Sequence, residues 1–451
     1  MFFMKKILLI SCFLCSSFFS FSQYIEGKVV DAQTKKPIEG VNVYMEVINR
    51  GAVTNEKGVY YLKFPYKIVK SGSIRFTHIT YKEIEIPYVP KKKEYSVSLL
   101  LDLQKLEEVN LSYSRNLKKT ISYKTLSSMK NAIHSFGSLL KDEKIYVVGG
   151  DTSFELNEFK KLMEYDPDRA LQKMMNGTAR NYSKYSYSGD LQTYDIKNDV
   201  WTKSKSKFRK RAYHNLNSYT NKIVVLGGKN ISANGKFEYL DAKIEVFDIN
   251  KDTTIIDNTN PHQASDFASF TYKDNMILMG GSRKIKNNGF REYSNKVHLY
   301  DFKTGNWYEI GNMPIPKEVK GVLIEDKIYL VGGFNKLPLS SVEVFDLKTQ
   351  KWKKEGNLFY GVRKPAITYH KNIIYFFNDG KINTYNIISK ELNEYLIELS
   401  LEASEMYFTN NKLYILGGFK KNSFSLHPSK GLFSIDINEF NNTRIHNSKT
   451  L

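Results

Sequence analysis

The feature that most constrains this 451-residue chain is a segment that recurs six times between residues 130 and 440. Each copy holds a short apolar run that ends in paired glycines, or in Asp379-Gly380 in one degenerate copy. The glycine pairs are Gly149-Gly150, Gly227-Gly228, Gly280-Gly281, Gly332-Gly333 and Gly417-Gly418. A second element follows in every copy, at Tyr194-Asp195, Phe247-Asp248, Tyr300-Asp301, Phe345-Asp346, Tyr385-Asn386 and Ile435-Asp436. Repetition at such a period indicates equivalent units that pack against one another.

Three copies also carry a tryptophan six residues after the Asp, at Trp201, Trp307 and Trp352. The pattern resembles the kelch motif, and this resemblance implies a six-bladed kelch β-propeller over residues 130–451, with about 54 residues per copy. Paired glycines permit the positive φ needed after a second strand, and the tryptophans supply apolar area between blades. We therefore expect these residues, together with His134 and His214, to be structural.

Residues 24–101 predict a small β-sandwich, so the fold class is all-β throughout. Short alternating runs are separated by turn signals, for example Ile25 to Val30, Val41 to Met45 and Val59 to Leu62. The elements Gly-x-Val-x-Asp, Pro-Ile-x-Gly-Val-x-Val and Thr-Asn-x-x-Gly-x-Tyr resemble the carboxypeptidase-regulatory-like, transthyretin-like domain. This resemblance implies a non-catalytic module of exported bacterial proteins. Residues 102–129 are expected to be a linker.

Residues 1–22 are typical of a secretory signal peptide. Lys5 and Lys6 precede a mostly apolar stretch, and Ser20 and Ser22 place small residues before a cleavage site at Gln23. The alternatives are a membrane anchor or a lipoprotein signal with Cys12 as the lipidated residue. No second run of 18 or more apolar residues follows, so no transmembrane span is expected in the mature chain. The predicted location is the periplasm, the outer membrane surface or the medium.

Cleavage would remove both cysteines and two lysines, which lowers the net charge from +20 to +18. Cysteine nucleophiles and cysteine-ligated metals are thereby excluded, as are copper radical oxidases that resemble galactose oxidase and need a cysteine-linked tyrosine. The sequence also lacks a nucleophile elbow, a P-loop, a dinucleotide fingerprint, a zinc-protease motif and an EF-hand loop. We expect no cofactor and no metal.

The first copy is longer than the others. It has 44 residues from Gly150 to Tyr194, against 19 at the same place in the second and third copies. Leu156, Phe159 and Leu162 have helical spacing, which predicts one or two short helices within about 152–190. We expect these helices to pack on the propeller, and a lid or partner-binding arm is the alternative. How the ring closes stays open: by a last strand at 443–446, or by a strand at 109–114 on an outer edge.

In kelch propellers the loops between strands two and three and the loops between blades lie on one face, which usually binds ligands. The candidate ligand-binding residues on these loops are Arg211, His262, Arg283, Arg291, Lys317 and Arg363. Converging Arg and Lys side chains suit carboxylate, sulfate or phosphate groups. The alternative is that the basic composition carries no specific site. No nucleic-acid reading module occurs, so nucleic-acid binding is not expected.

These observations favour a non-catalytic exported protein whose propeller face recognises a protein or an anionic glycan of the cell envelope. The sandwich would serve as a spacer or docking module. The rival hypothesis is a periplasmic enzyme that resembles sialic-acid mutarotases, which need only acid and base groups in the propeller pocket. Its candidate carboxylates are Glu318, Glu402, Glu405 and Asp266.

Overall fold

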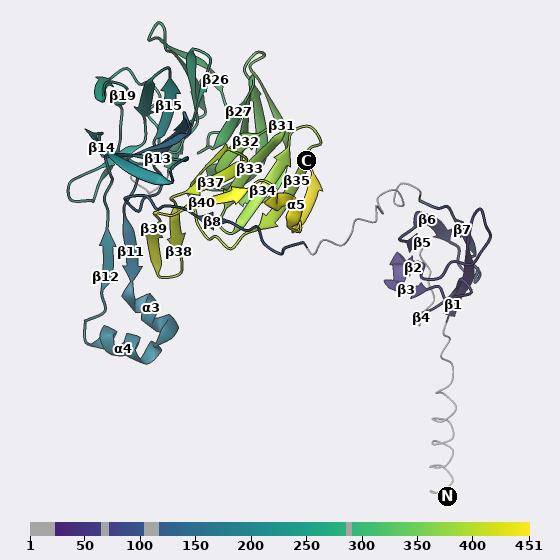
Figure 1. Cartoon of the computed structure of the whole chain (residues 1–451). Helices are drawn as coiled ribbons and strands as arrows, with labels where there is room; N and C mark the ends of the chain where they lie inside the picture. Colours follow the sequence, from purple (N-terminus) through teal and green to yellow (C-terminus); the bar gives the residue numbers. More distant parts are fainter. Residues whose placement is uncertain (1–22, 65–71, 103–116, 286–290) are drawn as a thin grey trace, which may run out of the picture. The chain divides into compact units, whose positions relative to one another are not determined.

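The computed structural model describes residues 23–64, 72–102, 117–285 and 291–451 (Figure 1). The chain divides into two compact units, with the boundary between residues 115 and 116. The predicted signal peptide with Cys12, and the strand considered at 109–114, lie outside the described residues. Within the described ranges, no helix is long and apolar enough to cross a membrane.

The first unit is a small sandwich of two sheets, with strand orders β4-β1-β7 and β3-β2-β5-β6. Side chains alternate between buried and exposed along strands such as β4, and fully buried Val29, Val43 and Phe76 come from both sheets. The elements are β1 (Gln23–Asp31), β2 (Asn42–Met45), the 3-10 helix η1 (Glu46–Ile48), β3 (Arg50–Val53), β4 (Val59–Phe64), β5 (Gly72–His78), β6 (Tyr81–Tyr88) and β7 (Val97–Leu99).

The second unit is a propeller, and the six-bladed prediction is confirmed: each blade is a sheet with four strands in antiparallel order. Blade 1 holds β9 (Gly137–Lys141), β10 (Lys144–Val148), β13 (Asp190–Asp195) and β14 (Val200–Lys207). Blade 2 holds β15 (Asn215–Tyr219), β16 (Lys222–Leu226), β19 (Ile244–Asp248) and β20 (Thr253–Asp257). Blade 3 holds β21 (Ala268–Tyr272), β22 (Asn275–Met279), β25 (Lys296–Asp301) and β26 (Trp307–Asn312).

The remaining blades follow the same plan. Blade 4 holds β27 (Gly321–Ile324), β28 (Lys327–Val331), β30 (Leu337–Asp346) and β31 (Lys351–Val362). Blade 5 holds β32 (Ala366–His370), β33 (Ile373–Asn378), β34 (Lys381–Asn386) and β35 (Glu391–Leu396). Blade 6 holds β36 (Glu405–Thr409), β37 (Lys412–Leu416), β40 (Leu432–Asp436) and the outer strand β8 (Lys124–Thr125). Short hairpin strands between the second and third strands are β17 (Lys229–Ile231), β18 (Glu238–Leu240), β23 (Ser282–Ile285), β24 (Arg291–Tyr293) and β29 (Phe334–Asn335).

The second strand of each blade is buried along nearly its whole length, because both of its faces meet neighbouring blades. Trp201, Trp307 and Trp352 pack beside Tyr194, Tyr300 and Phe345, with ring centroids 5.1, 4.8 and 4.7 Å apart. The paired glycines adopt positive φ, and a Cβ on Gly227 would lie 2.4 Å from the ring of Phe267. These residues therefore have the structural role expected for them.

The ring closes through the start of the second unit. Strand β8 pairs with β40, so residues 124–125 supply the outer strand of blade 6. The C-terminal strand β41 (Asn447–Thr450) instead pairs with β35 and becomes a fifth strand of blade 5. The range 117–129 thus lies against the propeller, although the sequence analysis places it in the linker. A two-residue strand leaves too little alternation to be seen in the sequence.

The insertion in blade 1 forms an arm (Figure 1). Its stalk is a sheet in the order β12-β11-β39-β38, which joins loops of blades 1 and 6. The strands are β11 (Phe154–Asn157), β12 (Asn181–Lys184), β38 (Phe419–Lys421) and β39 (Ser425–Pro428), and the tip carries α3 (Glu158–Tyr165) and α4 (Pro167–Met175). Of the two helices, only α4 has a buried residue, Ala170. The helices therefore do not pack on the blades as expected, because the β38–β39 hairpin supports them instead.

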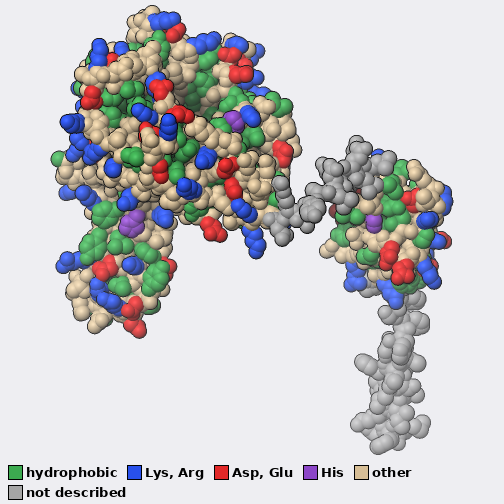
Figure 2. Space-filling model, in the orientation of Figure 1, with side chains coloured by type: hydrophobic (Ala, Val, Ile, Leu, Met, Phe, Trp, Pro, Cys, Tyr) green, Lys and Arg blue, Asp and Glu red, His purple; other side chains and the backbone are tan. Residues whose placement is uncertain are grey.

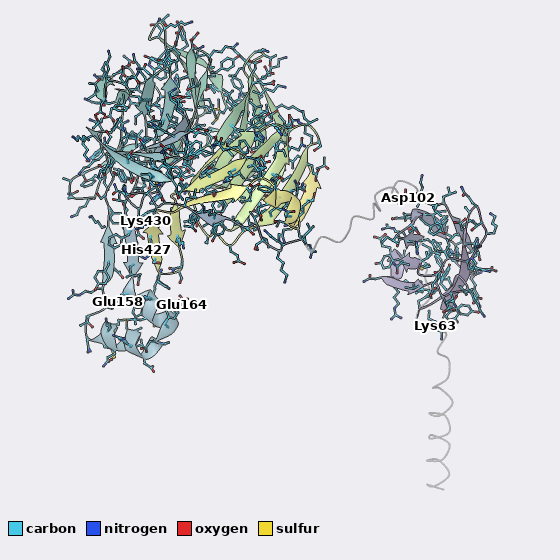
Figure 3. All side chains as sticks on the ribbon, viewed as in Figure 1. Lys63, Asp102, Glu158, Glu164, His427 and Lys430 are labelled. Carbon is cyan, nitrogen blue, oxygen red and sulfur yellow. The ribbon has the colours of Figure 1, made fainter. Side chains whose placement is uncertain are left out.

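Polar contacts fix the tip on its stalk (Figure 3). Glu158 pairs with Lys173 at 2.5 Å and joins α3 to α4, and Asn157 and Asp166 cap the two helices. Glu164 accepts a hydrogen bond from Ser423 in the β38–β39 turn at 2.7 Å. The arm is thus an ordered substructure that projects from blades 1 and 6.

Candidate functional site

The innermost strands of all six blades surround a central channel. A chamber of about 380 Å³ in this channel is lined from all six of these strands and the connections into them. The Lys320–Glu405 ion pair, at 2.5 Å, joins blades 4 and 6. Both residues also line a smaller cavity of about 30 Å³ on the side of the connections between blades. We call that end of the channel the mouth.

Five non-glycine residues at the mouth share one repeat position, two residues before the innermost strand, and one backbone conformation. Their φ angles are 49° at Ser135, 62° at Tyr213, 57° at Asp266, 51° at Lys364 and 50° at Ala403. All five line the smaller cavity, and we call them the mouth collar. Left-handed backbone at such residues is strained and is often found at functional sites.

Backbone hydrogen bonds hold the collar in place around the ring. Tyr213 N donates to Ser135 O at 2.6 Å, and Asp266 N donates to Tyr213 O at 3.1 Å. Val319, at the same repeat position in blade 4, donates its N–H to Asp266 O at 3.1 Å. Four successive blades are therefore linked at the edge of the mouth. These bonds fix the backbone positions from which the collar side chains extend.

Lys364 is the central cation of the collar. Its Nζ lies 2.6 Å from Asp266 Oδ1 and 4.4 Å from the ring centroid of Tyr213. Burial alone would raise the pKa of Asp266, but the charges of Lys364 and Lys229 hold that pKa below its ordinary value. Asp266 Oδ2 is buried and has no hydrogen-bond partner among the described residues. One carboxylate oxygen is thus left available beside the cavity.

A second polar group lies beside Tyr213. Its hydroxyl donates to Asp151 Oδ2 at 2.7 Å, and Lys229 Nζ lies 4.9 Å from its ring centroid. His134 Nε2 is 3.8 Å from the same carboxylate. Burial lowers the pKa of His134 to about 4, although Asp151 opposes this shift, so the imidazole is neutral at pH 7. Neutral His134 cannot supply a cation to the mouth.

Two arginines converge on one buried carboxylate. Arg291 Nη1 lies 2.9 Å from Glu318 Oε1, and Arg363 binds Oε2 through Nε at 2.9 Å and Nη2 at 2.8 Å. The guanidinium of Arg363 also stacks on Phe334, 4.1 Å from its ring centroid. Both arginine side chains keep about a third of their surface, 32% and 33%, whereas that of Glu318 keeps 2%. Glu318 thus fixes two arginine side chains that both remain partly exposed.

The structure brings together only two of the six predicted ligand-binding residues, Arg291 and Arg363. Arg211 is fully buried and pairs with Glu245 at 2.8 Å, and Lys317 is fully buried and pairs with Glu343 at 3.0 Å. Both cations lie two residues before the collar position of their blades, where they meet a glutamate of the third strand.

The other two predicted residues also lie apart from the arginine pair. His262 is buried. Its Nδ1 forms a hydrogen bond with Nδ1 of His298 at 2.8 Å, and its Nε2 lies 2.9 Å from the carbonyl oxygen of Gly280. Arg283 is exposed in β23. Of the four carboxylates considered for catalysis, Asp266 and Glu405 line the cavities of the channel. Glu318 instead holds the two arginines, and neither Glu318 nor Glu402 lines either cavity.

Tyr213, Lys364 and Asp151 are not among the six ligand-binding residues that the sequence analysis singles out. The first two could have been found by aligning the six copies, since the collar residue always lies two positions before the first strand. Asp151 follows the first glycine pair, and its bridge to His134 is repeated at the same place in other blades. The position of a residue within the repeat, rather than its type, therefore indicates which residues line the mouth.

This geometry defines an all-β chain with a sandwich-like domain followed by a kelch-repeat propeller. Residues 25–111 match the CarboxypepD_reg-like domain, and residues 177–378 match the KLHDC2/KLHL20/DRC7 Kelch-repeats domain. The chain carries both domains, as the resemblances implied.

Individual relatives match only parts of this chain. The Arabidopsis thaliana acyl-CoA-binding domain-containing protein 5 is 25% identical over 37% of this chain and 28% of its own length. Human Kelch-like protein 15 is 26% identical over 40% of this chain and 31% of its own length. The chain thus spans less than a third of the length of these two relatives. A solved structure, YjhT, superposes with a TM-score of 0.50 and 13% identity, over 69% of this chain and 99% of that one, which shows the fold alone.

Proposed function

We propose that this protein is an exported, non-catalytic binding protein whose propeller mouth recognises a carboxylate on a protein or an anionic glycan of the cell envelope. The sandwich serves as a spacer or docking module on the same chain. The observation that carries the proposal is the convergence of Arg291 and Arg363 on Glu318. A buried glutamate fixes both guanidinium groups, and each arginine side chain keeps about a third of its surface exposed.

Fixed arginines are well suited to an incoming carboxylate. The planar fork of guanidinium donors matches the two oxygens of a carboxylate, and little side-chain entropy remains to be lost on binding. Burial alone would lower the pKa of Arg291, but Glu318 raises it above its ordinary value, so its charge is secure. The aromatic side chains of Phe334 and Tyr293 lie beside this pair, with centroids 6.3 Å apart, and offer apolar faces to the same ligand.

The arm supports a macromolecular ligand rather than a small one. Its tip exposes Met175, Tyr165 and Met174 at 83%, 69% and 54% of their surface, and Figure 2 shows hydrophobic side chains along the arm. Clustered exposed apolar side chains mark interaction surfaces, and methionine adapts to irregular partners. The stalk arises from the same end of the blades as the mouth, so a large ligand could touch both.

The test is binding of residues 23–451 to a glycan array and to solubilised cell-envelope proteins, at low and high salt. The informative variant is the Arg291→Lys/Arg363→Lys double substitution, which keeps both charges beside Glu318 but removes the forks. We expect at least about tenfold weaker binding of the captured ligand. Lys251→Ala, an exposed residue in the turn after β19 at the other end of the blade, is the matched control. Undiminished binding by the double variant would contradict the proposal.

A second candidate, a mutarotase-like enzyme, is favoured by one observation. Burial, reinforced by the charge of Asp379, raises the pKa of Glu402 above its ordinary value, and Arg363 acts on it in the opposite direction. A raised pKa makes a carboxyl group better suited to act as a general acid. The test is NMR of anomer interconversion of N-acetylneuraminic acid, with Glu402→Gln as the variant and exposed Glu398→Gln as the control. A rate equal to that in buffer would contradict this candidate.

A further inference from the structure

A second pocket lies at the end of the propeller opposite to the mouth. It has a volume of about 320 Å³ and lies between blades 5 and 6. We call it the blade 5–6 pocket. Its lining includes His370 from the β32–β33 turn and Glu391 after the β34–β35 turn, which are at the far end of blade 5 from the connections that form the mouth. This volume is within the range of small-molecule sites.

Blade 6, like blades 2 and 5, lacks the tryptophan that blades 1, 3 and 4 carry. Trp201, Trp307 and Trp352 each pack against the preceding blade, as part of the apolar cores shared by blades 6 and 1, 2 and 3, and 3 and 4. In blade 6 the equivalent position is Asn442, which ends the short helix α5 (Glu439–Asn442). The outer strand β8 has only two residues, so the interface with blade 5 is left partly unfilled.

Three aromatic side chains form the wall of the pocket. Phe440 of α5 meets Tyr375 and Tyr395 of blade 5, with ring centroids 5.3 and 5.1 Å away. Tyr375 and Tyr395 are 4% and 6% exposed. Neither hydroxyl forms a hydrogen bond with any residue in the described part of the chain. Burial, with Tyr395 nearby, raises the pKa of Tyr375 to about 12, so the phenol stays protonated and can donate.

An unsatisfied acceptor lies in the same wall. Asn393 Nδ2 donates to Glu391 Oε1 at 2.7 Å, which fixes the orientation of the amide. Asn393 Oδ1 is then buried without a hydrogen-bond partner among the described residues. Buried polar atoms are nearly always paired, so an unpaired carbonyl beside a pocket indicates a donor that is supplied from outside. Thr384, Asn411 and Asn441 add further neutral polar groups to the lining.

The charges of the pocket balance. Lys371 and Glu391 are its oppositely charged lining residues, and burial lowers the pKa of the nearby His370, which keeps that imidazole neutral at pH 7. Aromatic faces pack on the C–H faces of a sugar ring, and amides and hydroxyls exchange hydrogen bonds with its hydroxyl groups. We propose that the blade 5–6 pocket binds one uncharged sugar residue. This site is independent of the carboxylate site at the mouth.

The experiment is saturation-transfer NMR and calorimetric titration of residues 23–451 with glucose, galactose, mannose and N-acetylglucosamine. We expect saturable binding of at least one of them. The Tyr375→Phe/Tyr395→Phe variant keeps both rings but removes both hydroxyls, and we expect at least about tenfold weaker binding. Tyr414→Phe is the matched control, because Tyr414 has the same strand position in blade 6 as Tyr375 in blade 5.

A further variant separates binding from folding. Asn393→Leu replaces the unpaired amide with an apolar side chain of similar size, so we expect loss of sugar binding together with an unchanged or higher melting temperature. The Arg291→Lys/Arg363→Lys variant should bind the sugar as the wild type does, which distinguishes this pocket from the mouth. No saturable signal with any of the four sugars, or wild-type affinity in the double tyrosine variant, would overturn the proposal.

Discussion

The ammonium group of Lys364 in blade 5 lies 2.6 Å from Oδ1 of Asp266 in blade 3, and this contact joins two blades across the mouth of the channel. Both side chains are largely buried, at 16% and 5% exposure. Neither charge has bulk water as an alternative partner, so each depends on the other. The collar is therefore held by charge pairing as well as by its backbone hydrogen bonds.

Removing one partner should consequently destabilise the propeller. Asp266→Ala leaves the Lys364 ammonium buried and unpaired, and we expect a loss of about 3 kcal/mol or more in the free energy of unfolding, measured by urea denaturation. The Asp266→Leu/Lys364→Met variant removes both charges and should be much closer to wild type. Equal stability of the single and double variants would show that the pair is not coupled.

Acid should weaken the fold through His262. Burial, together with His298, lowers the pKa of His262 to about 3, below the ordinary value of 6.5. As the pH falls below 6.5, the unfolded chain binds a proton at this residue that the folded chain does not bind. The free energy of unfolding should therefore fall by about 1.4 kcal/mol for each pH unit between about 6 and 4. Urea denaturation at several pH values measures this slope, and His262→Gln should reduce it by that amount.

Ring closure should depend on residues 117–129. Strand β8 completes blade 6, and Ile121, 2% exposed, belongs to the apolar core between blades 5 and 6. A chain that starts at residue 130 should melt at a lower temperature and be cleaved faster by protease than a chain that starts at residue 117. Thermal unfolding followed by circular dichroism compares the melting temperatures of the two chains. Equal melting temperatures would mean that the seam contributes nothing.

The tip of the arm should be replaceable without cost to the fold. Met174 and Met175 are exposed and contact no core, so Met174→Ser/Met175→Ser should leave the melting temperature within about one degree of wild type. Capture of envelope proteins should fall if the tip contacts the partner. Ala170→Asp is the contrasting change, since it places a charge at the one buried position of α4 and should unfold the tip.

The blades were predictable from the sequence because their determinants are local. The apolar run of β37 and the glycines after it lie within a few residues of one another, and so do Tyr194 and Trp201. The site was harder to predict because Arg211 and Arg291 both lie in polar stretches of the sequence, yet Arg211 is fully buried against Glu245, whereas Arg291 pairs with Glu318 and keeps 32% of its side-chain surface. Both arginines meet a buried glutamate, and packing between blades decides which of the two stays partly exposed.

The arm and the blade 5–6 pocket depend on contacts between distant segments. Strand β11 pairs with β39, although one belongs to the first blade and the other to the last. Phe440 meets Tyr375 only because the chain turns into α5 where other blades continue into a fourth strand. Such pairings leave no periodic pattern in either segment, so the sequence indicates the helices of the arm but not where they stand.

The pairing of β8 with β40 also sets an order of events during synthesis. Residues 124–125 leave the ribosome before any blade exists, but their partner, residues 433–434, follows only after all the other strands of the six blades except β41. The first blades can fold as they are synthesised, yet the propeller ring cannot close until the chain is nearly complete. Contacts so far apart in sequence form slowly. Until then, the blade edges on both sides of the gap are exposed, and a chaperone that binds this protein should act in that interval.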